Sequence, residues 1–402
     1  MIPADLARDQ WREWLQQSSS NQHPVALYLH TPFCHHRCAF CPFYINRASP
    51  GYSRTYTDLL LREIAGTPAP GRTVNSVFFG GGTPSDLATE DLVRVLEQLR
   101  KQWQWTNATE ITVEARIRGF TADKARIWWQ AGVNRFSLGV QTTDSQLRRS
   151  LGRLADRREI LDTLQQVTAA THAHVSVDLL YGLPGQTPEM LREDIRLLTD
   201  ETAISGITCY ELACFPNSPM AQAISQGRLP ALPDSGQLAS LYFAVREELA
   251  DSGFFRHSLV HWHRRANDRC VYNRHVKDGG DLVPYGSGAG GNIGDRQLML
   301  SRTLEEYRSL VSNDQKPITF ASRLNLARRQ IQAGITSGFE NMRLRPESFE
   351  ILGRDGRDYM AKILEQWRKS KLLDYECQLT PGGEFWAKTM EKNLLAAASH
   401  FA

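Results

Sequence analysis

The chain has 402 residues, enough for two or three domains of ordinary size or for one αβ barrel with an appendage. Its hydrophobic fraction of 41% and charged fraction of 23% are those of a folded globular protein and exclude wholesale disorder and fibrous classes. A net charge of +3 gives no overall field for gathering nucleic acid, and no apolar run approaches the ~18 residues of a membrane span.

Residues 1–24 predict a lead helix. They mix acids with bases and lack the continuous apolar stretch of a secretory signal, so we expect a cytoplasmic protein. The chain has seven cysteines, an odd number, and three of them lie close together at Cys34, Cys38 and Cys41. In a reducing compartment this crowding favours metal or redox chemistry over a disulfide framework.

Residues 25–252 alternate between two hydrophobic periods, β-rich runs and longer stretches of helical spacing. The expected strands are 25–30, 74–79, 110–113, 135–139, 175–180 and 206–211. The expected helices after them are 56–64, 92–103, 122–131, 159–170, 190–198 and 238–249. Six strand–helix units predict a parallel sheet with helices covering its outside.

The number of units restricts the architecture. Six are too few for a closed eight-stranded barrel, which leaves an open partial barrel or a doubly wound sheet. In both architectures ligands bind at the carboxyl ends of the strands. The loops expected there, among them TPFCHHRCAFC, GGGTPS and YGLPGQ, concentrate glycine, proline and polar residues.

The strand–helix alternation stops near residue 253. A glycine-rich segment follows at 285–294, and the tail from 304 is mainly helical. Within that tail, residues 371–386 predict two short strands around a turn and then a helix, the outline of a winged-helix module. We therefore expect four regions: a lead helix at 1–24, a core at 25–252, an extension at 253–303 and a C-terminal domain at 304–402.

The C-x3-C-x2-C motif of Cys34, Cys38 and Cys41 follows the first expected strand. A structural zinc site requires four ligands, and His30, His35 or His36 could supply the fourth. An iron–sulfur cluster held by three thiolates leaves one iron open to bind a substrate. Free buried cysteines are the third alternative. The position at strand carboxyl ends favours the cluster, because a catalytic metal belongs there.

The motif, with Phe40 before its third cysteine, resembles the signature of radical S-adenosylmethionine (SAM) enzymes. Further segments follow the order and spacing of the oxygen-independent coproporphyrinogen oxidase branch: YLHTPFC, GGGTPS, VEARIRG, SLGVQ and DLLYGLPGQT. The resemblance implies an α/β fold, an open (β/α)6 partial TIM barrel of radical SAM type, with a mainly helical, winged-helix-like C-terminal domain. It also implies a [4Fe-4S] cluster on the three cysteines.

The resemblance further implies a SAM site. The expected cofactor-binding residues are Tyr28, Phe40, Gly81, Gly82, Thr83, Glu114, Gln141, Arg153 and Asp178. We expect the glycines to let backbone approach the methionine moiety of SAM, where a β-carbon would collide. Taken singly, each polar residue could equally be a solvated strand-end charge or a helix cap.

Within the branch, CAFCPFYIN with Phe43, Tyr44 and Asn46 is similar to the anaerobic heme-degrading methyltransferases, the anaerobilin synthase family. The segments CVYNRHVK and YGSGAGGNIG also resemble the second half of that family, in which the glycine-rich stretch faces the active site. The implied reaction uses two SAM molecules on heme and yields a methylated linear tetrapyrrole and free iron. A flavodoxin- or ferredoxin-type electron donor is implied as well.

Alternatives from other classes stay open. One is a heme chaperone or a coproporphyrinogen III dehydrogenase of the same superfamily. Another is a nucleic-acid-modifying enzyme, which the absence of a basic run argues against. His257, His261, His263 and His275 lie around Cys270 and could include a heme ligand, although hydrogen-bonded histidines are more common. Trp262 and Tyr272 would suit stacking on a porphyrin or plain packing.

Overall fold

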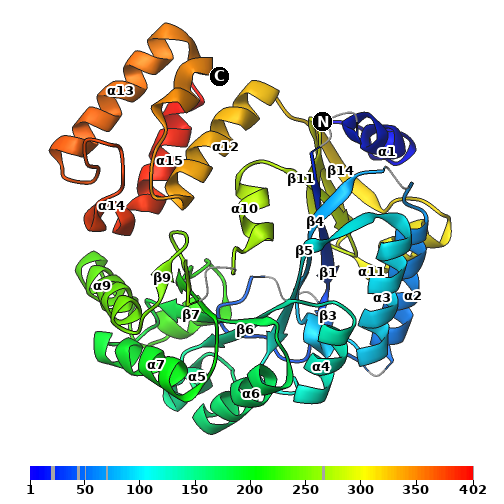
Figure 1. Ribbon diagram of the computed structural model, residues 1–402, viewed down its shortest axis with the longest axis horizontal. Coiled ribbons are helices and arrows are strands. Elements are labelled where there is room, and N and C mark those ends of the chain that lie inside the picture. The colour runs from blue at the N-terminus through cyan, green and yellow to red at the C-terminus, as the bar shows by residue number, and fades with distance from the viewer. Residues whose placement is uncertain (20–22, 43–45, 50, 69–70, 265–267, 402) are drawn as a thin grey trace.

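The computed structural model describes residues 1–402 except 20–22, 43–45, 50, 69–70, 265–267 and 402. Phe43 and Tyr44 therefore lie outside the described residues. The described chain forms one curved sheet with helices on its convex side and a separate group of helices near the C-terminus (Figure 1). In the described part of the chain, no helix combines the length and apolarity that crossing a bilayer requires.

The six strands expected from the sequence are present and parallel, which confirms the open partial barrel. They run in sheet order as β1 (Val25–Thr31), β4 (Thr73–Gly81), β5 (Gln104–Arg116), β6 (Arg135–Gln141), β7 (His174–Tyr181) and β8 (Gly206–Glu211). The covering helices are α2 (Tyr52–Ala65), α3 (Thr89–Gln102), α4 (Ala122–Gln130), α6 (Arg157–Ala170), α7 (Pro188–Glu201) and α9 (Ser235–Asp251). Each covering helix buries one apolar stripe, as with Leu92, Val95 and Leu99 of α3.

The sheet continues beyond these strands on both sides. β11 (Asp281–Tyr285) adds a parallel strand next to β1, with Val25 opposite Asp281. It is extended by the antiparallel strands β12 (Gly290–Ile293), β13 (Arg296–Leu300) and β14 (Ile318–Arg323). The other end carries β10 (His261–His263) and β9 (Phe255–Arg256). Because β11 is parallel to β1, the glycine-rich loop after it lies at the same carboxyl edge as the cysteine loop.

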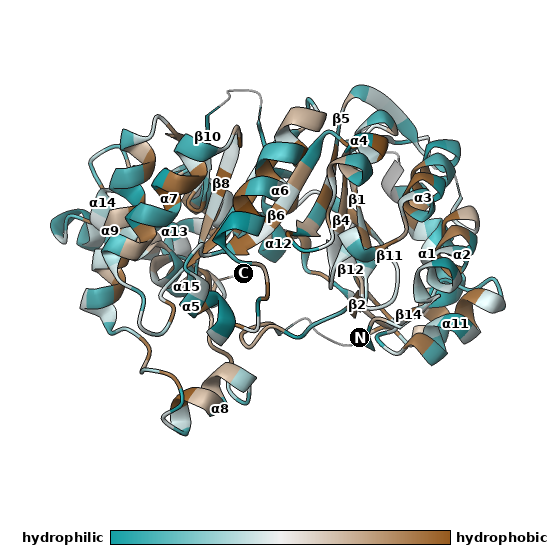
Figure 2. Cartoon of the chain, turned by 90° about the horizontal axis from the view of Figure 1, so that it is seen from below, coloured by the Kyte–Doolittle hydropathy of each residue, from teal (hydrophilic) through white to brown (hydrophobic). Residues whose placement is uncertain are grey.

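Shorter elements and two further helices complete the barrel region. They are α1 (Ala4–Ser19), β2 (Phe33–Cys34), β3 (Asn46–Arg47), α5 (Ser145–Ser150), α8 (Pro219–Ser225), α10 (Val271–Lys277) and α11 (Leu304–Ser312). α10 lies on the concave side of the sheet, in contact with β1, β4 and β11 (Figure 1). Figure 2 shows apolar residues concentrated on the strands and α8 projecting from the body of the molecule.

The C-terminal helices have their own core. They are α12 (Leu326–Glu340), α13 (Gly353–Lys369), α14 (Pro381–Phe385) and α15 (Ala387–Ala398), and their buried side chains run from Ile331 to Ala398. Tyr307 and Ala321 instead pack in the core of the barrel, so packing joins α11 and β14 to the barrel rather than to the tail. The two strands expected within 371–386 are reduced to a bridge between Leu373 and Leu379, followed by α14 and α15.

Candidate active site

The cysteine loop is fixed to three parts of the barrel mouth. Cys34 lies in β2, which pairs with β3 beside it. The backbone N–H of Ala39 donates to Leu151 O at 3.0 Å, and Met220 N–H donates to Ala39 O at 3.0 Å. All three cysteines of the motif are free thiols that keep partial exposure. The loop therefore presents its thiols to the mouth and not to the core.

The three thiols are not gathered as closely as a tetrahedral zinc site requires. Tetrahedral zinc with Zn–S bonds of about 2.3 Å places its sulfurs only about 3.8 Å apart. Among the described residues, one group of three potential ligand atoms converges within 4.8 Å, and it does not contain these cysteines. His30 is paired with Tyr28, and His35 lies 3.7 Å from Asp86. The donor set thus fits three-thiolate ligation of an iron–sulfur cluster.

A cavity of about 260 Å³ opens beside the thiols. Its lining includes Cys34, Cys38, Phe40, Cys41, Gly81, Gly82, Thr83, Glu114, Gln141, Arg153 and Asp178. The structure therefore brings together every expected cluster and SAM residue except Tyr28. They come from β4, β5, β6 and β7 and from the loops after β1 and α5, all at one edge of the sheet.

The glycines of the GGGTP turn are required by the protein's own backbone. Gly81 has φ of 110°, and a β-carbon there would lie 2.7 Å from the His30 ring. A β-carbon on Gly82 would lie 2.2 Å from Phe33 O. We expected glycine at these positions because the backbone would approach the methionine moiety of SAM. The structure gives a more direct reason, since the turn packs against the start of the cysteine loop.

Glu114 and Asp178 are a half-buried carboxylate pair that lines the cavity. Burial, with a contribution from Asp178, raises the pKa of Glu114 to about 8. Burial also raises the pKa of Asp178 to about 6, against the opposing effect of Arg135. Ser137 Oγ donates to Asp178 at 3.2 Å. Two carboxylates whose charged forms are disfavoured by burial are suited to a ligand that brings positive charge and hydroxyl donors.

Gln141 and Arg153 each aim unsatisfied polar atoms at the cavity. The end of β6 is irregular between Gly139 and Gln141, and Gln141 has φ of 69°. Gln141 Oε1 and Arg153 Nε are buried without a hydrogen-bond partner, while Arg153 Nη1 donates to Gly139 O at 2.7 Å. Strain and unsatisfied atoms at one place are typical of a ligand site.

Arg148 belongs to the site but was not predicted, and Tyr210 lies near Asp178 outside the cavity lining. Arg148 lines the cavity and donates to the carbonyl oxygens of Val140 and Thr142. Tyr210 keeps 38% of its surface exposed although burial raises the pKa of its hydroxyl, with Asp178 the next cause. Tyr210 lines two other cavities, one beside His261 and one beside Tyr242. Strand alternation, which puts Tyr210 on the same face as Thr208, was the available signal.

Tyr28 lies below the cavity, not in its wall. Its hydroxyl is 2.9 Å from His30 Nδ1, and its ring stacks on Phe78 and on Tyr272 of α10 at 6.3 Å between centroids. The Val271 and Tyr272 N–H groups donate to the Glu110 carboxylate at 2.9 and 3.1 Å. Tyr272 of α10 therefore packs against a tyrosine and a phenylalanine ring.

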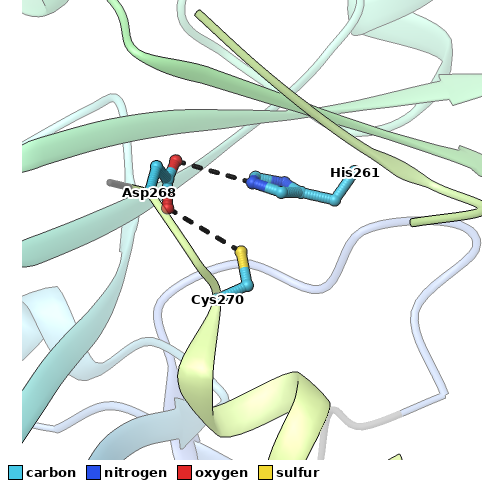
Figure 3. A group of neighbouring side chains, drawn as sticks. All are labelled: His261, Asp268 and Cys270. Atoms are coloured by element: carbon cyan, nitrogen blue, oxygen red, sulfur yellow. Dashed lines mark hydrogen bonds and ion pairs between the residues drawn. The ribbon is translucent and has the colours of Figure 1, made fainter. Parts of the chain in front are cut away.

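The histidines expected around Cys270 do not line the cavity beside Cys34, Cys38 and Cys41. His261 Nδ1 is 3.2 Å from Thr208 Oγ1, and its Nε2 is 3.5 Å from Asp268 Oδ2 (Figure 3). Arg135 Nε donates to Asp268 at 3.1 Å and balances its charge. His257 and His275 are also hydrogen-bonded, to Arg269 O and to Asp281 O. This geometry favours packed, hydrogen-bonded histidines over a heme ligand.

Comparisons with known proteins agree with the motif. The radical SAM superfamily profile matches residues 28–198. Anaerobilin synthase of Escherichia coli O157:H7 is 32% identical over 391 residues, 96% of this chain and 86% of that protein. The heme chaperone HemW of Bacillus subtilis is 28% identical over 71% of this chain and 75% of that protein.

The solved structures support the same fold. Coproporphyrinogen III oxidase (HemN) from Escherichia coli matches with a TM-score of 0.82, covering 100% of this chain and 95% of that one. At 23% identity this likeness concerns the fold alone.

Proposed function

The chain belongs to the radical SAM superfamily, in the branch that contains anaerobilin synthase and the HemW chaperones, and we propose that it opens the heme macrocycle without oxygen. The products would be a methylated linear tetrapyrrole and free iron. The observation that carries the proposal is the extent of the likeness to anaerobilin synthase, which includes the C-terminal helices and 86% of that protein. The likeness to HemW of Bacillus subtilis covers 71% of this chain.

Different residues of the chain would hold the cluster and bind SAM. Cys34, Cys38 and Cys41 would hold a [4Fe-4S] cluster, and Thr83 would orient the first of them through its hydroxyl. When bound, the cluster supplies the electron that cleaves SAM and gives a 5′-deoxyadenosyl radical. Arg153 suits the carboxylate of SAM, since guanidinium groups bind carboxylates with directed hydrogen bonds.

Glu114 and Asp178 would select the cationic cofactor. Their raised pKa values mean that a bound ammonium or sulfonium group favours loss of a proton from the pair. Tyr210 would contact the substrate, because it lies on the strand next to Asp178 and keeps part of its surface exposed. A second SAM as methyl donor is part of this proposal. The bound tetrapyrrole would exclude water from the radical.

The proposal is tested by incubating the reconstituted protein anaerobically with heme, SAM and a chemical reductant. Heme absorbance should fall only when SAM is present, and both 5′-deoxyadenosine and S-adenosylhomocysteine should appear, because radical formation and methyl donation leave different remnants. The Cys38→Ala variant is the control that should spare heme. Mass analysis should find a linear, methylated pigment.

Two other outcomes would favour the alternatives. Heme that stays intact, binds stably and passes to an acceptor protein indicates a chaperone. Conversion of coproporphyrinogen III with 5′-deoxyadenosine but no S-adenosylhomocysteine indicates a dehydrogenase.

A further inference from the structure

Three side chains of metal-ligating type converge in the core beside β8 and β10. They are His261, Asp268 and Cys270, and their ligand atoms lie within 4.8 Å of one another (Figure 3). All three residues are buried, with 2%, 1% and 5% of their surfaces exposed. The proposed function gives this group of side chains no role.

The hydrogen bonds around His261 leave one of its ring nitrogens as an acceptor. The Asp178 carboxylate accepts a hydrogen bond from the Thr208 hydroxyl. That hydroxyl has a single proton, so its 3.2 Å contact with His261 Nδ1 must use the proton on Nδ1. Nε2 then carries a lone pair, and it lies 3.5 Å from Asp268 Oδ2. Metal-ligating histidines are commonly oriented in this way, through the other ring nitrogen.

Asp268 uses one of its two oxygens and leaves the other without a partner. Arg135 Nε donates to Oδ1 at 3.1 Å. Among the described residues, Asp268 Oδ2 and His261 Nε2 have no hydrogen-bond partner, although both are buried. Two acceptor atoms that face each other repel, and each unpaired buried polar atom is costly. A cation between them would satisfy both, and an outer hydrogen bond such as the one from Arg135 is usual for a ligating carboxylate.

The backbone keeps space open beside these atoms. A β-carbon on Gly206 would lie 2.8 Å from Asp268 Oδ2 and 3.1 Å from Ser176 Oγ. The same β-carbon would lie 3.1 Å from the Cε1 atom of His261. Ser176 Oγ is also buried and has no hydrogen-bond partner in the part of the chain that the structure describes. A cavity of about 160 Å³, lined by His261 and Cys270, gives access to the group.

We propose that His261, Asp268 and Cys270 bind a zinc ion through Nε2, Oδ2 and Sγ. Zinc takes nitrogen, oxygen and thiolate ligands, and two ligand atoms at its usual bond lengths lie about 3.3 Å apart in a tetrahedral site. The 3.5 Å between Nε2 and Oδ2 is close to that spacing. Binding forms a zinc–sulfur bond and releases the thiol proton of Cys270, with no change of oxidation state. The carboxylate and thiolate charges balance those of the ion.

The ion would fix the start of α10. Cys270 directly precedes α10 and has φ of 44°, a left-handed conformation that is uncommon for a residue other than glycine. His261 lies in β10, so the ion would join β10 to α10. Tyr272, in the first turn of α10, packs on Tyr28 and Phe78. This structural role does not depend on heme as the substrate.

The test adds zinc chloride anaerobically to the full reconstituted protein with its iron–sulfur cluster in place. A chelating resin removes loosely bound zinc, and elemental mass spectrometry counts the zinc that each chain retains. X-ray absorption at the zinc edge counts the sulfur neighbours of that zinc. Cys270→Ala removes the thiol of the group. Cys209→Ala is the matched control, because Cys209 is a buried free cysteine in the adjoining strand β8.

The unaltered protein and Cys209→Ala should each retain about one zinc per chain, with one sulfur at about 2.3 Å and the other neighbours nitrogen or oxygen. Cys270→Ala should bind zinc at least about tenfold more weakly. Zinc should raise the midpoint of thermal unfolding of the unaltered protein and of Cys209→Ala but not of Cys270→Ala, since an ion that binds only the folded chain stabilises it.

Three results would overturn the proposal. The first is an unaltered protein that retains no zinc, which would leave an ordered water between the unsatisfied atoms. The second is a zinc with three sulfur neighbours, which would place the ion on the cysteine motif. The third is equal zinc retention in Cys270→Ala, or an equal loss in Cys209→Ala. Heme consumption is not part of this measurement, so its failure would count against the proposed function alone.

Discussion

The hydroxyl of Thr83 donates a hydrogen bond to Cys34 Sγ at 3.1 Å. This contact joins the GGGTP turn after β4 to the first cysteine of the loop after β1. Hydrogen bonds to ligating sulfurs are among the factors that set the potential of iron–sulfur clusters. The turn therefore does more than make room for the cysteine loop, since it also supplies a donor to one thiol.

Replacing Thr83 with valine should remove this donor at nearly constant volume. We expect the cluster to assemble with normal iron and sulfide content. Its midpoint potential should be more negative, because the hydrogen bond stabilises the reduced cluster, whose sulfur carries more negative charge. Potentiometric titration followed by electron paramagnetic resonance measures the shift. Thr83→Ser keeps the hydroxyl and should retain the original potential.

Replacing Cys34, Cys38 or Cys41 with alanine should abolish the cluster and SAM cleavage together. Cys214 is the matched control, because it is also partly exposed and packs beside the cysteine loop. Iron and sulfide analysis should find a normal cluster in Cys214→Ala and none in the three motif variants. A Cys41→Ala protein with full iron content would remove that residue from the ligand set.

Asp178→Asn should weaken SAM binding by about tenfold or more, the cost of losing one charge-assisted hydrogen bond. The cluster spectrum should stay intact, since Asp178 lies in β7 and not in the cysteine loop. Calorimetric titration with SAM is the measurement. Normal affinity in this variant would place Asp178 outside the SAM site.

Glu114 should make the unliganded protein less stable as pH rises. Its pKa is raised from 4.5 to about 8 by burial, so the folded chain holds a proton that the unfolded chain has released between these values. The free energy of unfolding therefore falls between about pH 4.5 and 8. The Glu114→Gln variant should show a smaller fall in the free energy of unfolding with pH. At pH 9 its free energy of unfolding should exceed that of the unaltered protein by on the order of 2 kcal/mol or more. Glu97→Gln, on an exposed site of α3, should leave the pH profile of thermal unfolding unchanged.

The buried pair of Lys316 and Glu63 should be essential to the glycine-rich loop. Lys316 Nζ lies 2.7 Å from Glu63 Oε1, and Glu63 also accepts from the Gly286 N–H at 2.9 Å. Lys316→Met leaves a buried carboxylate without its cation and should cost about 3–5 kcal/mol. Arg62→Met breaks the exposed pair with Asp314 and should leave the midpoint of the same denaturant titration nearly unchanged.

The strands that position the site were predictable because each carries its own local signal. The six parallel strands have clear periodicity; Glu114 and Asp178 lie in β5 and β7, and the cysteines follow β1. The residues meet because the carboxyl ends of parallel strands share an edge.

Other features depend on contacts that no local pattern encodes. β11 pairs with β1 although it lies far along the chain, and the glycines that follow it suggested only a loop. The place of Tyr28 depends on Tyr272 of α10, a short helix that enters the concave side of the sheet. Arg148 was missed because its role is to bind carbonyl oxygens exposed by the irregular end of β6.

The pairing of β1 between β4 and β11 also fixes the order of events during synthesis. β1 leaves the ribosome early, but its second neighbour exists only after Tyr285 has been made. Until then β1 has one open edge, which is a site for wrong pairing. We therefore expect the loop after β1, which would hold the cluster, to reach its final setting only after the first 285 residues have been made. Chains that stop before β11 would aggregate through β1.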